Sequence, residues 1–98
     1  FNRTMPKDLG ILSGLIEISV YQNRLQDDLT FISSLTNCTS LQLIEAAHNL
    51  FRGSLPDSIA NLSTYLNSID LQNNQIHGSI PSGIGNLLNL TVLVMTTN

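Results

Sequence analysis

Two carboxylates and a histidine stand at spacings that a repeating strand would bring together. Glu45 and Asp70 lie 25 residues apart, and His48 follows Glu45 by three residues. Paired carboxylates can act as general acid and general base, as they do in glycoside hydrolysis. A histidine beside carboxylates can also hold a metal ion. Which of these chemistries is available depends on the elements that carry the three residues.

The strongest pattern in the chain is a repeat that begins with L-x-x-L-x-L-x-x-N or an aliphatic variant of it. Successive copies are offset by 26, 25 and 24 residues, which indicates a repeat architecture rather than one globular core. The copies are Leu15–Asn23, Leu41–Asn49, Leu66–Asn74 and Leu90–Asn98.

Each part of the repeat has a physical reading. The alternating aliphatic residues predict a strand with one buried face, and stacked copies predict a parallel sheet. The asparagines Asn23, Asn49, Asn74 and Asn98 form a predicted ladder, because a buried amide can bond backbone groups of the turn and of the neighbouring layer. Gly53-Ser-Leu-Pro56 and Gly78-Ser-Ile-Pro81 then supply a bend and a fixed φ.

A far wall of short helical turns should close each layer. Ile59-Ala-Asn-Leu62 and Ile84-Gly-Asn-Leu87 have the spacing of a 3₁₀ turn with an apolar side. Cys38 falls in the same column as Leu62 and Leu87, so we expect a buried small hydrophobe and not a nucleophile. The stretch 26–34 lacks the glycine and proline, so the wall should bulge there while Leu29, Phe31 and Ile32 still point inward.

The repeat predicts an α/β leucine-rich-repeat fold. It is a right-handed solenoid with one short parallel strand per repeat of about 24 residues and an outer wall of 3₁₀ or short helical turns. We expect a partial repeat over 1–14 and strand-led repeats that start near residues 15, 41, 66 and 90. Neither a terminal cap, a membrane-spanning run nor a kinase signature is recognisable in the sequence. Since a repeat array needs caps, we expect the isolated chain to fold poorly or to associate through its ends.

Side chains between the buried positions of each strand should face solvent on the concave side. Their columns include Tyr21, Ala47, Gln72 and Thr96. Exposed aromatic, imidazole and carboxylate groups suit recognition of a partner. The predicted ligand-binding residues are Tyr21, Glu45, His48, Asp70 and Gln72.

On such an open face neither acid–base catalysis nor metal binding is favoured. It offers no pocket that excludes water, and one histidine beside two carboxylates is a weak metal signature. We therefore predict no catalytic residue, no metal and no cofactor, and that the chain is not an enzyme. A solvated scaffold with no ligand at all is the alternative for this stretch.

Composition narrows the class of partner. The 98 residues carry four Lys and Arg against seven Asp and Glu, a net charge of −3, so no nucleic-acid partner is expected. No apolar run is long enough to span a membrane, so no membrane contact by this segment is expected either. Four N-x-[ST] sequons favour a secreted, glycosylated surface. The candidate glycosylation residues are Asn2, Asn37, Asn61 and Asn89.

The stretch Asn74-Gln-Ile-His-Gly-Ser-Ile-Pro81 resembles the plant extracellular leucine-rich repeat, whose hallmark is N-x-L-x-G-x-I-P. Asn49–Pro56 is similar, with two apolar exchanges. The irregular run Phe31–Thr39 and the run Leu55–Thr64 look like repeats of the plant leucine-rich-repeat receptor-like serine/threonine kinases of the immune-receptor subfamily.

The resemblance implies a segment of a receptor ectodomain that functions in innate immunity or developmental signalling. Its partners would be a peptide or protein ligand and a co-receptor ectodomain. It would lie on the extracellular side of the plasma membrane as part of a single-pass receptor, or in the apoplast. Kinase activity would belong to another part of the parent. The alternative is a soluble cell-wall leucine-rich-repeat inhibitor that binds a secreted enzyme.

Overall fold

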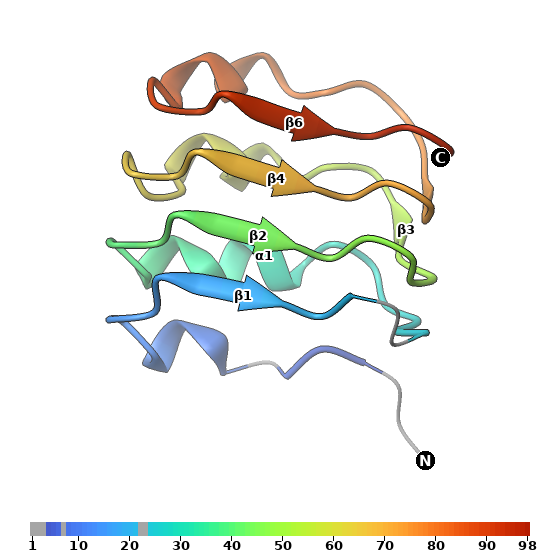
Figure 1. Ribbon diagram of the computed structural model, residues 1–98, viewed down its shortest axis with the longest axis horizontal. Helices are drawn as coiled ribbons and strands as arrows, with labels where there is room; N and C mark the ends of the chain where they lie inside the picture. Colours follow the sequence, from blue (N-terminus) through green and yellow to red (C-terminus); the bar gives the residue numbers. More distant parts are fainter. Residues whose placement is uncertain (1–3, 7, 22–23) are drawn as a thin grey trace.

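The computed structural model describes residues 4–6, 8–21 and 24–98. Its main element is a parallel four-stranded sheet in which the strands follow one another along the stack (Figure 1). Each strand has three residues, enough for one buried side chain between two that face out. The strands are β1 (Glu17–Ser19), β2 (Leu43–Glu45), β4 (Ser68–Asp70) and β6 (Val92–Val94).

Register in this sheet repeats from layer to layer. Ile18 pairs with Ile44, Ile44 with Ile69, and Ile69 with Leu93. The central residue of every strand is therefore aliphatic and turned to the interior, as the L-x-L spacing predicts. A slip of one residue would turn these side chains to solvent, so burial fixes the register.

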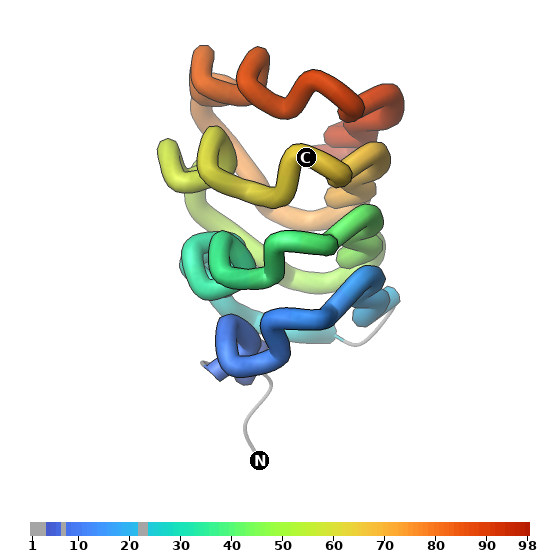
Figure 2. The backbone as a smooth tube through the Cα atoms, turned by 90° about the vertical axis from the view of Figure 1, so that its left-hand side faces the viewer, coloured from blue at the N-terminus to red at the C-terminus, as the bar shows by residue number. Residues whose placement is uncertain are grey.

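Short helices form the opposite wall of the stack. Figure 1 shows them behind the strands, and Figure 2 shows from the side how the backbone of each layer stacks on the next. Pro56 and Pro81, with φ of −73° and −57°, stand at the starts of η3 and η4, where their fixed φ suits a helical turn. The wall elements are η1 (Leu9–Ile11), α1 (Phe31–Ser34), η2 (Leu35–Asn37), η3 (Asp57–Asn61) and η4 (Ser82–Asn86).

A second, two-stranded parallel sheet joins strands β3 (Arg52–Gly53) and β5 (Gln75–Ile76). This second sheet was not predicted from the sequence. Gly53 and Gly78 have φ of +93° and +83°, so the predicted bends use a conformation that favours glycine. In the irregular layer, Asp28 makes only a single bridge to Arg52.

The core is layered and mostly aliphatic, and it includes two buried phenylalanines. Phe31 and Phe51 pack with ring centroids 5.1 Å apart. Leu29, Phe31 and Ile32 are buried, as predicted, although the extra residues form the α-helical turn α1 in the wall. Cys38 is fully buried as predicted, and burial raises the pKa of its thiol.

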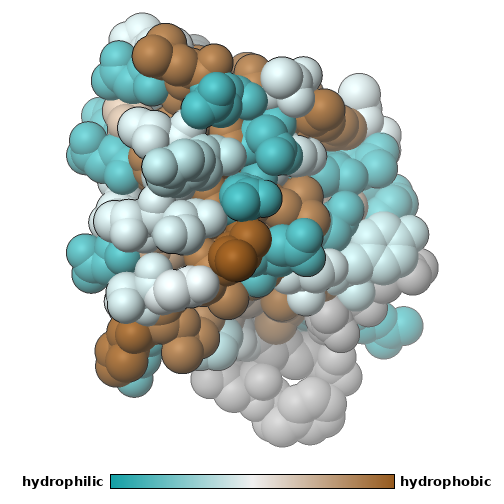
Figure 3. All heavy atoms as spheres, turned by 60° about the vertical axis from the view of Figure 1, so that its left-hand side comes forward, coloured by the Kyte–Doolittle hydropathy of each residue, from teal (hydrophilic) through white to brown (hydrophobic). Residues whose placement is uncertain are grey.

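Apolar side chains are exposed in the first and last layers, and Figure 3 shows brown spheres at the top and at the lower left of the stack as well as between them. Ile11 is 77% exposed in the first layer, and Leu88 is 86% exposed in the last. Leu12 of the first layer is 54% exposed, whereas its equivalents Cys38 and Leu62 are buried, because each central layer has a neighbour on both sides. Within the part of the chain that the structure describes, no helix combines the length and the apolar character needed to cross a bilayer.

Candidate binding face on the four-stranded sheet

The face of the four-stranded sheet turned away from the core carries the predicted ligand-binding residues. We call it the strand face and define it by the outward residues of the strands and of the three positions after each strand. Glu45 ends β2, Asp70 ends β4, and the two are partners in the parallel register. Tyr21, His48 and Gln72 follow the strands on the same side. The structure therefore brings the five residues onto neighbouring layers.

Both strand-end carboxylates stabilise the turn that follows them. Glu45 Oε1 accepts the amide of Ala47 at 2.9 Å, and Asp70 Oδ1 accepts the amide of Gln72 at 3.1 Å. These local bonds fix the carboxylates at the edge of the face. A carboxylate accepts through two oxygens, so each group retains an acceptor for a partner.

Tyr21, His48 and Asn73 contact one another in sequence across three layers, just after the strands. The rings of Tyr21 and His48 meet edge to face with centroids 5.1 Å apart. His48 Nδ1 lies 2.8 Å from Asn73 Nδ2, so Nδ1 accepts when the neutral ring carries its proton on Nε2. Tyr21 and His48 were among the binding residues predicted from the sequence, but Asn73 was not. Asn73 could have been predicted, because it occupies the same column of the repeat as His48.

One column of the predicted face needs a correction. Ala47 was expected to face solvent with Tyr21 and Gln72, but it is fully buried. Its side chain is a single methyl group between two long neighbours in adjacent layers, so it lies below the surface that they form. Ala47 therefore contributes its backbone to the turn and no side-chain surface to the face.

Beneath the face, the predicted asparagine ladder links consecutive layers. Asn49 Nδ2 donates to the carbonyls of Ala46 and Ala47 in its own layer and to Val20 of the layer before. Asn49 Oδ1 accepts the amide of Leu25 at 3.1 Å.

The later asparagines repeat this pattern one layer on. Asn74 bonds the carbonyl of Ala46 and the amide of Phe51, and Asn98 bonds the carbonyl of Leu71 and the amide of Ile76. Asn23 lies outside the described residues.

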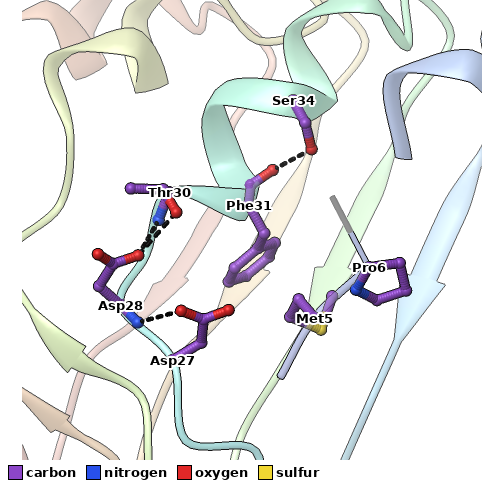
Figure 4. Close-up of a pocket in the computed structure, with 7 residues that line it drawn as sticks. All are labelled: Met5, Pro6, Asp27, Asp28, Thr30, Phe31 and Ser34. Carbon is purple, nitrogen blue, oxygen red and sulfur yellow. Dashed lines mark hydrogen bonds between the residues drawn. The ribbon is translucent and has the colours of Figure 1, made fainter. Parts of the chain in front are cut away.

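Two hollows lie away from the strand face, and neither is lined by Glu45 or Asp70. The larger, of about 330 Å³, separates Met5 and Pro6 from the irregular segment 27–34 (Figure 4). The ring of Phe31 and the side chain of Met5 point toward each other across it. Among the described residues no group of three or more His, Cys, Asp or Glu is placed to hold a metal ion.

Asp28 beside this hollow is a turn-forming carboxylate that was not predicted from the sequence. Its Oδ1 accepts the hydroxyl of Thr30 at 2.7 Å and the Thr30 amide at 3.0 Å. These bonds, the hydroxyl first, lower the pKa of Asp28, and the nearby Arg52 charge lowers it further. The sequence signal for this turn was the spacing Asp-x-Thr, followed directly by two apolar residues.

The described sequon asparagines all lie at the surface. Asn37 and Asn61 end the wall helices η2 and η3, whereas Asn89 lies on the loop into β6. Asn89 Nδ2 donates to the carbonyl of Thr64 at 2.6 Å. Asn2 lies outside the described residues.

Comparison with known proteins agrees with this architecture. The Leucine Rich Repeat family model matches residues 65–87. The chain is 47% identical over 49 residues to the receptor kinase-like protein Xa21 of Oryza sativa subsp. japonica, covering 50% of the chain and 5% of that protein. It is 58% identical over 71 residues to a probable LRR receptor-like serine/threonine-protein kinase of Arabidopsis thaliana, covering 72% and 7%. The chain thus spans only a small part of these relatives.

Solved structures give the same picture. The LRR ectodomain of the plant membrane receptor kinase GASSHO1/SCHENGEN3 from Arabidopsis thaliana, in complex with CASPARIAN STRIP INTEGRITY FACTOR 2, matches with a TM-score of 0.87 and 35% identity over 95% of this chain and 11% of that one. The PEPR1–AtPEP1 structure matches with a TM-score of 0.89 and 32% identity, over 97% and 13%. The BIR3–SERK2 complex from Arabidopsis thaliana matches at 0.78 and 31%, over 85% and 43%.

Proposed function

We propose that this leucine-rich-repeat segment, whose relatives are plant receptor-like kinases, uses its strand face to bind a peptide or protein ligand or a second ectodomain. The observation that carries the proposal is the grouping of Tyr21, Glu45, His48, Asp70 and Gln72 on adjacent layers of one open face. Glu45 and Asp70 end strands, and the other three residues lie in the turns directly after the strands. The sheet therefore holds these side chains at a fixed spacing, and a binding site supported in this way keeps its geometry.

The charge of the face favours a ligand with basic groups. The charged residues described in its strands are Glu17, Glu45 and Asp70, all of them carboxylates. Complementary charge speeds encounter and fixes the register of a partner. Edge-to-face rings at Tyr21 and His48 add an apolar anchor next to these charges.

We further propose that the chain acts outside the cell, as part of a receptor, and that it performs no catalysis itself. The relatives are named as receptor kinases, and two of the matching structures are receptors in complex with CASPARIAN STRIP INTEGRITY FACTOR 2 or with AtPEP1. Kinase activity would belong to parts of the relatives that the chain does not match. Glu45 and Asp70 lie on the open strand face and away from both hollows, which disfavours acid–base chemistry.

The proposal can be tested with a displayed library of random peptides selected against the immobilised 98-residue chain. Selected peptides should be enriched in lysine and arginine. Asp70→Asn removes a charge from the strand face yet retains an oxygen that can accept the Gln72 amide. We expect it to weaken binding by about tenfold, equivalent to about 1.4 kcal/mol.

Asp57→Asn is the matched control, because it makes the same exchange at an exposed position in the helical wall. It should leave the dissociation constant of the selected peptides unchanged. Equal weakening by both variants, or by neither, would show that these peptides bind elsewhere and would refute the strand face as the binding surface.

A further inference from the structure

The larger hollow lies where the irregular layer stands away from the layer before it. Met5 and Pro6 occupy in the first layer the place that Leu55 and Pro56 occupy in a regular one. The segment 26–34 has neither the glycine nor the proline of that place, and part of it forms the helical turn α1. The hollow of about 330 Å³ lies between Met5, Pro6 and this segment, so it arises from the irregularity of the repeat.

The hollow has an apolar wall with an aromatic ring in it. Met5 and Phe31 are buried, and their side chains point toward each other across the space (Figure 4). Phe51, which is fully buried, holds the Phe31 ring in place with 5.1 Å between the ring centroids. An aromatic ring that is fixed in this way can stack on a flat cation.

A half-buried carboxylate faces the same space. Asp27 Oδ1 accepts the amide of Asp28 at 2.9 Å, and Figure 4 shows the second oxygen of Asp27 on the side that faces Met5. In the part of the chain that the structure describes, no lysine or arginine pairs with Asp27. Asp27 therefore brings a negative charge and an unused acceptor to the edge of an apolar hollow.

The neighbouring carboxylate is engaged in its own turn. Asp28 Oδ1 accepts the hydroxyl and the amide of Thr30, and Figure 4 shows the carboxylate turned toward Thr30 and away from Met5. Besides these bonds, the charge of Arg52 lowers the pKa of Asp28. One carboxylate thus serves the hollow, which suits a single organic cation better than a metal ion that needs several oxygen ligands.

We propose that this hollow binds an arginine side chain of a protein partner. The guanidinium stacks on the Phe31 ring and donates to the second oxygen of Asp27. The aliphatic stem of the arginine packs against Met5 and Pro6. Ser34 Oγ donates to the carbonyl of Phe31 at 2.7 Å and keeps a lone pair that can accept a further guanidinium N–H.

The shape of the hollow favours one arginine side chain over other cations. An ammonium is a compact, strongly hydrated charge that cannot stack on a ring and donate sideways as a planar guanidinium does. Pockets for small molecules hold about 300–1,000 Å³, so a hollow at the lower end of that range suits one side chain. The proposal does not depend on the strand face, because none of the five residues predicted to bind there lines the hollow.

The test is a ¹H–¹⁵N NMR titration of the 98-residue chain with Nα-acetyl-L-arginine amide, which presents the side chain without the charges of a free amino acid. We expect the amide signals of Asp28, Thr30 and Phe31 to shift as the probe is added. The methylene protons of the probe should move upfield, because the ring current of Phe31 acts on them. The citrulline analogue, which lacks the charge, should cause none of these shifts, and the lysine analogue should bind more weakly.

Asp27→Asn isolates the contribution of the charge, because asparagine retains an oxygen that can accept the Asp28 amide. We expect this substitution to raise the dissociation constant of the arginine probe by about tenfold. Asp57→Asn is the matched control, since it makes the same exchange at an exposed position of the helical wall that does not line the hollow. It should leave the dissociation constant unchanged.

Absence of shifts around the hollow, or equal binding by the wild-type and Asp27→Asn chains, would overturn the proposed site. Equal binding of the citrulline analogue would refute the role of the charge, and equal binding of the lysine analogue would refute the assignment to arginine. Free L-arginine that binds more tightly than the blocked probe would replace a protein partner with a free amino acid. None of these results bears on the strand face, which the Asp70→Asn chain tests separately.

Discussion

Asn74 connects two layers of the solenoid through one buried side chain. Its amide donates to Ala46, Leu71 and Gln72 carbonyls, and its oxygen accepts the amide of Phe51. Asn74→Ala leaves the buried amide of Phe51 without its acceptor, whereas the three carbonyls keep a second donor each. We therefore expect the free energy of unfolding to fall by about 1–3 kcal/mol. Urea unfolding followed by circular dichroism measures the loss.

Asn67→Ala is the control for this substitution. Asn67 lies in the same layer but is exposed, and such surface changes usually stay within about 0.5 kcal/mol. If both alanine variants lose the same stability, the inter-layer hydrogen bonds of Asn74 are not what stabilises this turn.

Asp28 should give the chain a small dependence of stability on pH. Its pKa is lower in the folded state than the ordinary 3.8, first because of the Thr30 hydroxyl. The carboxylate bonds therefore stabilise the fold above that value, and the contribution is lost as pH falls through the lower folded pKa. Since Asp28 is exposed, we expect Asp28→Asn to cost less than about 1 kcal/mol near neutral pH.

Comparing the unfolding free energies of the wild-type and Asp28→Asn chains in strong acid checks the sign of this pH dependence. With the carboxylate protonated, the wild-type chain and the Asp28→Asn chain should have nearly equal unfolding free energies. A difference that grows as the pH is lowered would contradict the assignment of the stabilising bonds to the ionised Asp28.

At the residue scale, the repeat columns predicted which side chains lie in the core. They did not predict the exposure of side chains that depends on the size of the neighbouring residues. Cys38 was placed in the core because its column holds leucines. Ala47 was misplaced because a column position does not tell whether a methyl group lies below its neighbours. His48 and Asn73 have φ of +58° and +59°, a region that few non-glycine residues adopt although both of these residue types are enriched there. The signal for this turn was therefore weak.

At the scale of elements, the wall helices approach closely enough that two glycines in one turn should behave oppositely. A Cβ at Gly83 would stand 2.6 Å from Ala60 Cβ in the layer before, whereas a Cβ at Gly85 would meet nothing within 4 Å. We expect Gly83→Ala to destabilise the chain by about 1–3 kcal/mol through overpacking. Gly85→Ala should stabilise it by about 0.4–1 kcal/mol, because the unfolded chain loses freedom.

Thermal and urea unfolding of these two glycine variants checks the packing between η3 and η4. The variants differ by two positions in the same 3₁₀ helix, so helix propensity alone predicts the same sign for both. A stabilised Gly83→Ala chain would show that the layers have room for another methyl group.

The strands and wall helices follow from repeated patterns, and the remaining elements do not. A period of two and an Ile-x-x-Leu spacing are visible in every regular layer. Strands β3 and β5 have two residues each, too short for any periodicity to be read. The helix α1 arises where extra residues enter the layer, and sequence locates that insertion but not the shape that it takes.

At the scale of the whole molecule, the end layers should govern behaviour in solution. Ile11 and Leu12 are 77% and 54% exposed at one end, and Leu88 is 86% exposed in the last layer. Apolar surface of this kind favours association. We expect the average mass of the chain in sedimentation velocity to rise with concentration, and Ile11→Lys with Leu12→Lys to reduce that rise.

Tyr65→Ser is the control for association, because Tyr65 is 61% exposed but lies in a middle layer. It should leave the concentration dependence unchanged. A chain that stays monomeric at every concentration, or one in which Tyr65→Ser acts as strongly as the lysine pair, would rule out the end layers as the contact.

The parallel register also has a mechanical consequence. Backbone hydrogen bonds between strands, such as Ala46 N to Asp70 O and Leu71 N to Val94 O, run along the direction in which the layers stack. Tension applied along that direction loads the layers in series, so the weakest layer gives way first and the others stay intact. A released layer of 24 residues, the offset between Ile69 and Leu93, adds about 80 Å of extended chain. Under load this segment would lengthen in steps, one repeat at a time.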